Sequence, residues 1–199
     1  MNAIPTVTKN LLIINVLMFL GTVVAQSYGI DLNQYLGLHF FLAGDFNAAQ
    51  LITYMFMHAN FSHIFFNMFA LWMFGRTLEY ELGQKRFLTY YMVCGIGAAL
   101  IQYLTALAFG EFPLVLVGAS GAVMGLLLAF GVLHPNAVIM LLIPPIPMKA
   151  KWFVVIYGVI ELFLGWRGVG NVAHFAHVGG MLWGFLLLQW WKQRGIIRF

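Results

Sequence analysis

Residues 118–125 read Gly-Ala-Ser-Gly-Ala-Val-Met-Gly and place one hydroxyl group, that of Ser120, among small residues. The apolar run from Ser120 to Leu133 has 14 residues and ends before His134-Pro135, a pair that stops a helix. A helix of that length measures about 21 Å, whereas the hydrocarbon core of a bilayer is about 30 Å thick. We therefore predict a short membrane helix that begins at Ser120, with its N-terminus and the positive end of its dipole inside the bilayer.

Two interpretations of this octet are open. A glycine-flanked serine at the start of a helix is a common way to present a nucleophilic hydroxyl group. Small residues at this spacing also form a packing notch between membrane helices. The octet alone favours the packing notch, so the choice between the two interpretations depends on residues elsewhere in the chain.

The composition is that of a membrane protein. Of the 199 residues, 62% are hydrophobic and 8% are charged, and the mean hydropathy is +0.90. Successive apolar runs predict an all-α polytopic membrane protein that forms one domain over residues 1–199. We place its six transmembrane helices at roughly residues 10–28, 54–75, 87–109, 115–133, 152–166 and 171–191.

The connections between these spans differ in character. Residues 29–56 are too polar to span and too apolar for a free loop, which predicts a structure in the membrane interface. Residues 134–151 form a connection that four prolines interrupt. The single cysteine, Cys94, excludes an internal disulfide and a cysteine-based metal site.

The basic residues predict the topology. With the N-terminus inside, nine of the ten fall in cytoplasmic segments, and only Arg167 falls outside. The nine are Lys9, Arg76, Lys85, Arg86, Lys149, Lys151, Lys192, Arg194 and Arg198. The positive-inside rule then predicts a multi-pass protein of the cell (inner) membrane with both termini cytoplasmic and Ser120 submerged toward the outer face. Because the basic residues are scattered over helix ends, we expect no nucleic-acid partner.

Two further spans carry polar groups that lipid does not favour. His63 and Asn67 are four residues apart and share one helix face, and His58 lies about a turn or more further out. In the last span, His177 shares a face with Gly180 and with Gly184.

Two glycine pairs predict how these helices meet. Gly121-xxx-Gly125 and Gly180-xxx-Gly184 are close-approach motifs. If they face one another, they bring His177 within reach of Ser120.

The predicted chemistry is acyl transfer. A neutral imidazole such as His177 can take the proton of the Ser120 hydroxyl group near pH 7. The resulting oxyanion needs fixed donors, which the Ser120 N–H, the Asn67 amide and the His63 imidazole could supply. We expect no carboxylate beside His177, and therefore a Ser–His dyad. Glu161, the only acid inside a span, is interpreted as reaching to the interface.

Three motifs resemble those of the rhomboid intramembrane serine proteases, in that family's order. They are His58-x4-His63-x3-Asn67, Gly118-Ala-Ser120-Gly121 and Ala176-His177-Val-Gly-Gly180, and Phe74-Gly-Arg-Thr-Leu-Glu79 and His134-Pro-Asn136 are similar as well. The resemblance covers roughly residues 50–190. It implies a six-helix bundle with a water cavity open to the outer side, and hydrolysis of peptide bonds in or near transmembrane segments of other proteins.

The resemblance also implies roles for individual residues. Ser120 would be the nucleophile, His177 the base, and His63 and Asn67 the donors to the oxyanion. Where many relatives carry an aromatic residue on the catalytic imidazole, this chain has Met124, whose thioether can pack against a ring.

The remaining candidates are predicted to line the cavity or to support its structure. They are His58, Gly118, Gly121, His174 and Met124. His174 lies one turn before His177, but the Gly-Gly pair that follows His177 favours His177 as the base. His39 and His134 are interpreted as interhelical hydrogen-bonding or interfacial residues.

Two other functions compete with the protease. A transporter with a polar pathway is disfavoured because the spans lack coupling acids and show no inverted repeat. A non-proteolytic rhomboid-like protein that binds membrane proteins is disfavoured because both Ser120 and His177 are present. Without a His-Glu-x-x-His motif a zinc metalloprotease is excluded, and we expect no metal and no cofactor. The expected partners are transmembrane protein substrates and the lipid bilayer, and the sequence predicts no oligomeric state.

Overall fold

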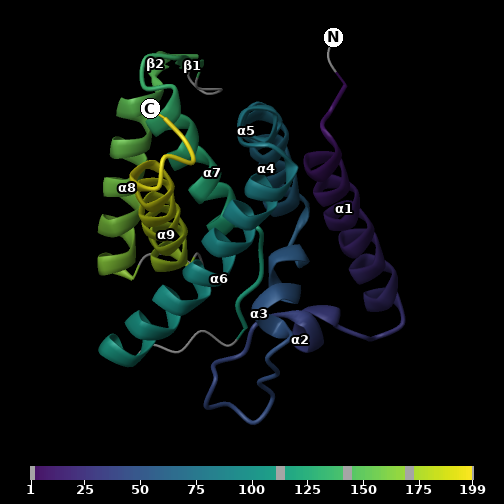
Figure 1. The fold of residues 1–199 in the computed structure, drawn as a ribbon. Coiled ribbons are helices and arrows are strands. Elements are labelled where there is room, and N and C mark those ends of the chain that lie inside the picture. Colours follow the sequence, from purple (N-terminus) through teal and green to yellow (C-terminus); the bar gives the residue numbers. More distant parts are fainter. Residues whose placement is uncertain (1–2, 111–114, 141–144, 169–172, 199) are drawn as a thin grey trace.

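The computed structural model describes residues 3–110, 115–140, 145–168 and 173–198 as a helical bundle (Figure 1). Its elements are α1 (Thr6–Ser27), α2 (Leu32–Leu36), α3 (Gln50–Thr53), the 3-10 turn η1 (Tyr54–Phe56), α4 (Phe61–Ala70), the π-helical segment η2 (Leu71–Gly75), α5 (Arg76–Leu82), α6 (Gln84–Phe109), α7 (Ser120–Leu133), β1 (Val138–Met140), β2 (Pro147–Lys149), α8 (Ala150–Arg167) and α9 (His174–Gln193). The first two residues of the span predicted at residues 171–191 fall outside the described residues.

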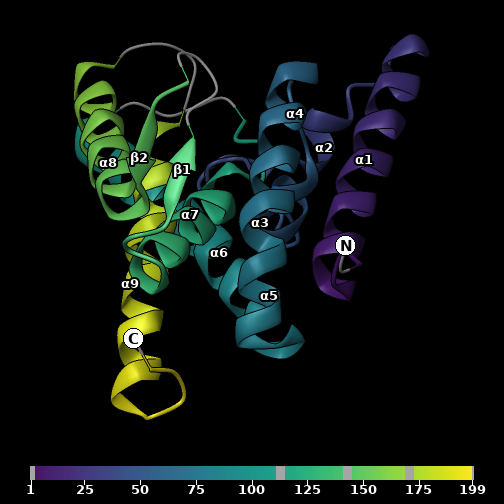
Figure 2. The same cartoon turned by 90° about the horizontal axis from the view of Figure 1, so that it is seen from above.

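Helix α7 lies in the interior of the bundle, where it packs against α6 and α9. Figure 2 shows α1 at one edge and α8 at the other, with the remaining helices between them. Most of α7 is buried, including Leu126 and Ala129, because a helix that is apolar on all sides needs protein or lipid around it. It begins at Ser120 and ends at Leu133, as predicted for the short helix, whereas the range of residues 115–133 predicted for the whole span starts five residues before the helix does.

Two of the described helices, α1 and α6, are long and apolar enough to cross a membrane, and α7 is a shorter apolar helix. Large hydrophobic side chains are exposed along α1 and α8, among them Leu17, Leu20, Val159 and Phe163. Such surfaces suit lipid rather than water, and the chain is an integral membrane protein.

The second predicted span differs from its prediction at both ends. The continuous helix begins at Phe61 rather than near residue 54, and it extends to Leu82 rather than ending near residue 75. Asn60 caps it, since its side-chain oxygen accepts a hydrogen bond of 2.9 Å from the backbone N–H of His63. The Phe74-Gly75 pair does not end the helix because it belongs to the wider π-helical turn η2.

The start of α1 is held by a buried carboxylate of α5. Glu79 accepts hydrogen bonds from the backbone N–H groups of Val7, at 2.8 Å, and Thr8, at 2.6 Å, and from the Thr8 hydroxyl group, at 2.8 Å. The first N–H groups of a helix have no partner within the helix, so Glu79 satisfies them and complements the helix dipole.

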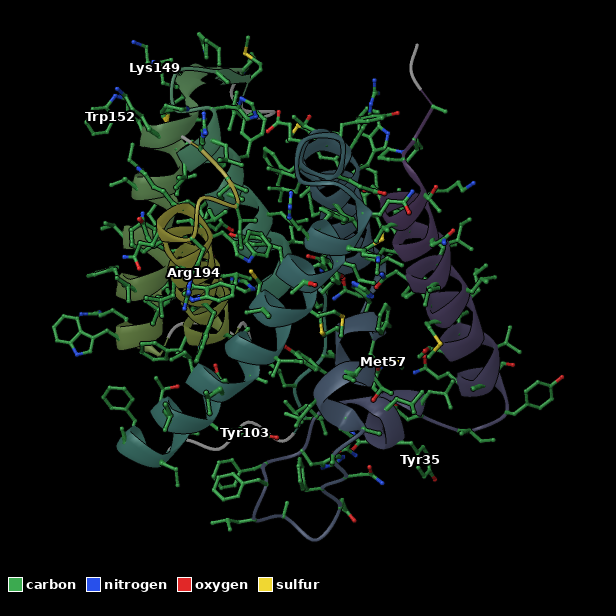
Figure 3. The ribbon with its side chains drawn as sticks, viewed as in Figure 1. Tyr35, Met57, Tyr103, Lys149, Trp152 and Arg194 are labelled. Atoms are coloured by element: carbon green, nitrogen blue, oxygen red, sulfur yellow. The ribbon has the colours of Figure 1, made fainter. Side chains whose placement is uncertain are left out.

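Residues 29–56 are folded around the buried side chain of Gln50. Its oxygen accepts hydrogen bonds from the backbone N–H groups of His39, at 3.3 Å, and Asn47, at 3.1 Å. Its nitrogen donates to the carbonyl groups of Tyr35, at 3.2 Å, and Asp45, at 3.1 Å. Figure 3 shows Tyr35 at the opposite end of the molecule from Lys149, the last residue of β2 in the two-stranded β1–β2 ladder.

The two glycine motifs meet as the sequence predicted, at one of their two positions. A side chain at Gly180 would collide with the carbonyl group of Gly121, and one at Gly125 would lie 3.2 Å from the carbonyl oxygen of Gly180. Gly184 instead faces Tyr90 and Cys94 of α6, so this glycine brings α9 against α6 rather than α7. The close approach sets the distance between the start of α7 and the start of α9.

Candidate active site

The segment before Ser120 is fixed by backbone hydrogen bonds to the folded first loop. Leu38 and Leu116 exchange a pair of bonds of 2.8 and 2.9 Å, and the N–H of Gly118 donates to the carbonyl oxygen of Tyr54 at 2.9 Å. Gly118 has a φ of 130°, which favours glycine. The chain then turns into α7, so that Ser120 is its first residue.

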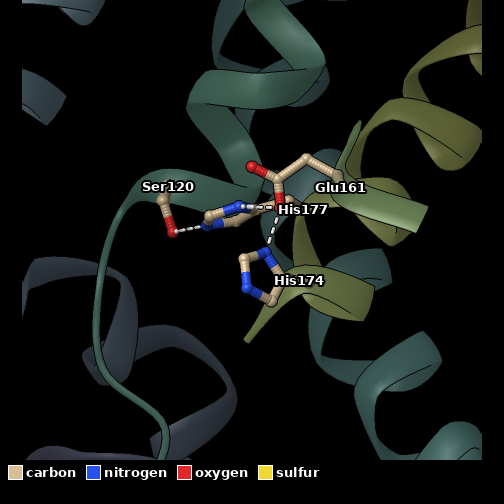
Figure 4. Close-up of polar contacts among 4 residues, drawn as sticks. All are labelled: Ser120, Glu161, His174 and His177. Carbon is tan, nitrogen blue, oxygen red and sulfur yellow. Dashed lines mark hydrogen bonds and ion pairs between the residues drawn. The ribbon is translucent and has the colours of Figure 1, made fainter. Parts of the chain in front are cut away.

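The hydroxyl group of Ser120 meets the imidazole of His177 (Figure 4). Its Oγ is hydrogen-bonded to Nε2 of His177, and the two atoms are 2.8 Å apart. His177 is buried in the first turn of α9, close to the contact between Gly121 and Gly180. Serine and histidine, 57 residues apart in the sequence, are thus brought within hydrogen-bonding distance by helix packing.

A carboxylate lies behind this histidine, contrary to the expectation from the sequence. Glu161 of α8 is buried, and its Oε2 lies 2.7 Å from Nδ1 of His174 and 3.0 Å from Nδ1 of His177. The His174 contact is a hydrogen bond, whereas the His177 contact has the distance of an ion pair without hydrogen-bond alignment. Two predictions are therefore wrong: that Glu161 reaches to the interface, and that no carboxylate lies beside His177.

The packing of α8 against α9 explains the position of Glu161. Both helix ends meet near Arg167 and His174, so that Glu161, about two turns before the end of α8, faces the first turn of α9. A buried carboxylate is tolerated where partners satisfy it, and here the two imidazoles do so.

His63 lies on the other side of Ser120. The backbone N–H of Ala59 points to Nδ1 of His63 at 3.4 Å, which leaves Nε2 to carry the proton. A side-chain carbon placed on Gly118 would lie 2.7 Å from this Nε2 and 3.6 Å from Oγ of Ser120. The imidazole N–H and the serine oxygen therefore border the same small space beside Gly118.

Asn67 lies one turn further along α4, and its side chain is buried. Its amide nitrogen has no hydrogen-bond partner among the residues that the structure describes. A buried N–H donor without a partner costs free energy, which is consistent with a donor kept for a reacting group.

The other candidates occupy supporting positions. His58 is buried, and its ring packs edge-on against His63 with 5.0 Å between ring centroids. Met124 is partly buried and packs against the hydrophobic core. His134 joins α7 to α5 through a contact of 2.8 Å with Glu81, as an interhelical pair. The ring of His39 contacts the carbonyl oxygen of Gln34 at 2.7 Å, within the first loop.

One group of side chains could hold a metal ion by its donor types. Glu161, His174 and His177 each offer one ligand atom, and these atoms lie within 4.8 Å of one another. Two imidazoles and a carboxylate are a common set of zinc ligands. Oε2 of Glu161 contacts both histidines directly, at 2.7 Å for His174 and 3.0 Å for His177, so the buried carboxylate has partners of its own within the protein.

Comparison with known proteins gives the family. The sequence model of the Rhomboid domain matches residues 45–192. The chain is 33% identical over 152 residues to "Rhomboid protein 1, mitochondrial" of Saccharomyces cerevisiae, which is 74% of this chain and 42% of that protein. It is 34% identical over 140 residues to "Putative rhomboid protease YdcA" of Bacillus subtilis, 69% of this chain and 64% of that protein.

A third relative is "Presenilin-associated rhomboid-like protein, mitochondrial" of Bos taurus, 28% identical over 155 residues, 73% of this chain and 40% of that protein. The chain therefore matches less than two thirds of the length of each of these three relatives. The matched domain includes the segments that carry His63, Asn67, Ser120 and His177. The chain belongs to the rhomboid family.

Proposed function

We propose that this protein is an intramembrane serine endopeptidase that cleaves transmembrane segments of other membrane proteins. The observation that carries the proposal is the 2.8 Å hydrogen bond between Oγ of Ser120 and Nε2 of His177 at a helix start. His177 accepts the hydroxyl proton while Oγ attacks the carbonyl carbon of the scissile peptide bond. The imidazolium then gives this proton to the leaving amine, and water hydrolyses the acyl-enzyme with His177 again as the base.

The tetrahedral intermediate needs donors for its oxyanion. The Ser120 N–H at the start of α7, Nε2–H of His63 and the amide nitrogen of Asn67 are the groups we assign to it. Their support is the position of His63 beside Gly118 and the unpartnered amide of the buried Asn67.

Labelling of the serine tests the proposal directly. A fluorophosphonate probe added to the purified protein in detergent should modify one residue, Ser120, and mass spectrometry of the labelled peptide would identify it. Ser27, whose hydroxyl group is exposed near the end of α1, serves as the internal control and should stay unmodified. If Ser120 also stays unmodified, a non-proteolytic membrane-protein binder becomes the better assignment.

Replacement of Asn67 by alanine is expected to slow cleavage by about 10²- to 10³-fold, the usual effect of removing one oxyanion donor. Activity should remain, because the His63 and Ser120 donors are still present. The measurement is kcat on a transmembrane substrate in liposomes. Asn10→Ala, at an exposed position of α1, is the matched control. A wild-type kcat for Asn67→Ala would remove Asn67 from the site.

We also propose six spans, with both termini cytoplasmic and Ser120 open toward the outer side through a polar cavity. In support, the start of α1 and Lys149 lie at one end of the molecule, and the first loop with Tyr35 lies at the other (Figure 3). Lys149, one of the nine basic residues predicted to be cytoplasmic, thus lies at the end of the molecule away from the first loop.

The topology can be tested with single cysteines in a Cys94→Ala background, because Cys94 itself is buried. Ala59→Cys, at an exposed position beside His63, is expected to react in intact cells with a membrane-impermeant maleimide. Lys85→Cys, exposed in the first turn of α6, should react only after the cells are opened. The reverse pattern would overturn the proposed orientation.

A further inference from the structure

We propose that Glu161 is a positioning residue of the active site, so that Ser120, His177 and Glu161 work as a triad, with His174 holding the carboxylate. This inference rests on the proposed function, since it assigns a role within the same reaction. It replaces the dyad expected from the sequence by a site to which three helices, α7, α8 and α9, each contribute.

Glu161 is a buried carboxylate. Only 4% of Glu161 is exposed, and α8 around it is otherwise apolar. Moving a carboxylate out of water is costly unless hydrogen-bond donors or opposite charges compensate. The Tyr157 hydroxyl group, one turn earlier in α8, also interacts with the carboxylate. The groups in contact with Oε2 are two imidazoles, and one of them is the proposed base. Glu161 is therefore committed to the two histidines rather than to solvent.

The tautomer of His177 depends on this carboxylate. An ionised carboxylate only accepts hydrogen bonds, so the nitrogen that faces it carries the proton. Nδ1 of His177 lies 3.0 Å from Oε2 of Glu161 without hydrogen-bond alignment, and a negative charge at this distance favours the proton on Nδ1. Nε2 is then left with its lone pair, and it is Nε2 that lies 2.8 Å from the Ser120 hydroxyl group. Glu161 thereby selects the tautomer in which His177 can act as a base.

A second charge forms during the reaction. When His177 accepts the serine proton it becomes an imidazolium, with a negative charge already beside it. Stabilising this ion pair in a buried site lowers the barrier to the attack by Ser120. The carboxylate keeps its charge throughout and takes up no proton, so the proton balance of the reaction is unchanged.

His174 fixes the carboxylate in this arrangement. Its Nδ1 donates to Oε2 of Glu161 at 2.7 Å, and its ring stands almost perpendicular to that of His177, at 86°. Because this bond does not depend on the protonation of His177, Oε2 stays in place when the base changes its charge. His174 is thus a second positioning residue, which acts through Glu161.

The tautomer of His177 can be read in the unmodified protein. Solid-state NMR of ¹⁵N-histidine-labelled protein in liposomes, with His177 assigned by comparison with His177→Gln, should show the Nδ1–H tautomer. The Nε2–H tautomer would overturn the inference. This result is independent of whether the protein cleaves anything, so it separates the inference from the proposed function.

Kinetics supply the second test. Glu161→Gln is expected to lower kcat by up to about 10⁴-fold, the loss seen when the orienting carboxylate of a triad is replaced by its amide, with little change in KM. Glu161→Asp retains the charge and should recover part of this loss. Glu81→Gln is the matched control, since it removes the carboxylate of another Glu–His pair, at the far end of α7, and should leave kcat unchanged.

Three outcomes would contradict the inference. One is a wild-type kcat for Glu161→Gln, and another is an equal loss for Glu161→Asp and Glu161→Gln in samples that unfold at the wild-type temperature. The third is a loss of Ser120 labelling when the protein is treated with EDTA, since the three ligands would then act through a metal ion. Absence of labelling in the untreated wild-type protein would instead refute the proposed function.

Discussion

Replacement of Ser120 by alanine is expected to reduce cleavage of a transmembrane substrate to the uncatalysed background. Oγ is the atom that would form the acyl-enzyme, and loss of a nucleophilic serine lowers kcat by about 10⁶-fold in a well-studied protease. The fold should persist, because the substitution removes a single partly buried oxygen whose side-chain partner is His177. The measurement is the cleavage of a fluorogenic transmembrane peptide by protein reconstituted in liposomes.

The matched control for this experiment is Ser27→Ala. It removes a hydroxyl group that bonds only locally, to the carbonyl oxygen of Val24 at 2.7 Å, and should cleave at the wild-type rate. Thermal unfolding in detergent, measured in parallel, should show similar midpoints for both variants. Substantial cleavage by a folded Ser120→Ala protein would exclude Ser120 as the nucleophile.

The second large effect is expected for His177→Ala, which should also abolish cleavage and fluorophosphonate labelling. Without the imidazole, none of the residues that the structure describes is hydrogen-bonded to Oγ as a base that could take its proton. His174→Ala should act differently, because it removes a support of Glu161 and leaves the base in place. We expect a partial loss of about 10- to 10²-fold in kcat for His174→Ala, smaller than that for direct loss of an orienting carboxylate.

His134→Ala provides the comparison for both histidine variants. It breaks a Glu–His contact of similar length, 2.8 Å, but at the C-terminal end of α7 and partly in solvent. It should keep the wild-type kcat. Retained activity in His177→Ala together with complete loss in His174→Ala would reverse the assignment of the base.

The sequence predicted the pairing of Ser120 with His177 because the signal is local on each helix. Gly121 and Gly125 of α7 and Gly180 of α9 mark the faces that approach closely, whereas Gly184 faces α6. When these two faces pack together, the serine at the start of α7 and the histidine in the first turn of α9 are brought close to one another. The glycines on either side of Ser120 likewise indicated the start of α7, and Pro135 indicated its end.

The role of Glu161 could not be read in the same way. Its distance of four residues from Gly165 suggests a side chain near the membrane surface, and the actual end of α8, at Arg167, lies only slightly further on. The sequence alone does not show which side of α8 faces α9, and so it does not show whether the carboxylate points into the protein. Glu161 precedes the turn between the last two spans by about as many residues as His174 follows it. This spacing would have placed the two side chains at similar depths in the membrane, and it was the available sign of their contact.

The predicted start of the second span was wrong because an average of hydropathy over neighbouring residues does not reveal a break in the helix. Tyr54 to Asn60 is as apolar as many helices, yet it forms a 3-10 turn and a capped loop before α4 begins. The Asn60 cap was the available sign of this start. At the other end, glycine usually suggests a stop, but Gly75 remains in the helix and is buried against Phe87 of α6.

The π-helical segment Leu71–Gly75 has a consequence for the evolution of this chain. Deleting one residue from an ordinary α-helix turns everything beyond it by about 100°. A π-helical turn holds one residue more than an α-helical turn, so a deletion within Leu71–Gly75 can be absorbed by tightening that turn. In this helix it is the place where a homologue can be one residue shorter and still keep Asn67 on the side of Ser120 and Glu79 on the start of α1.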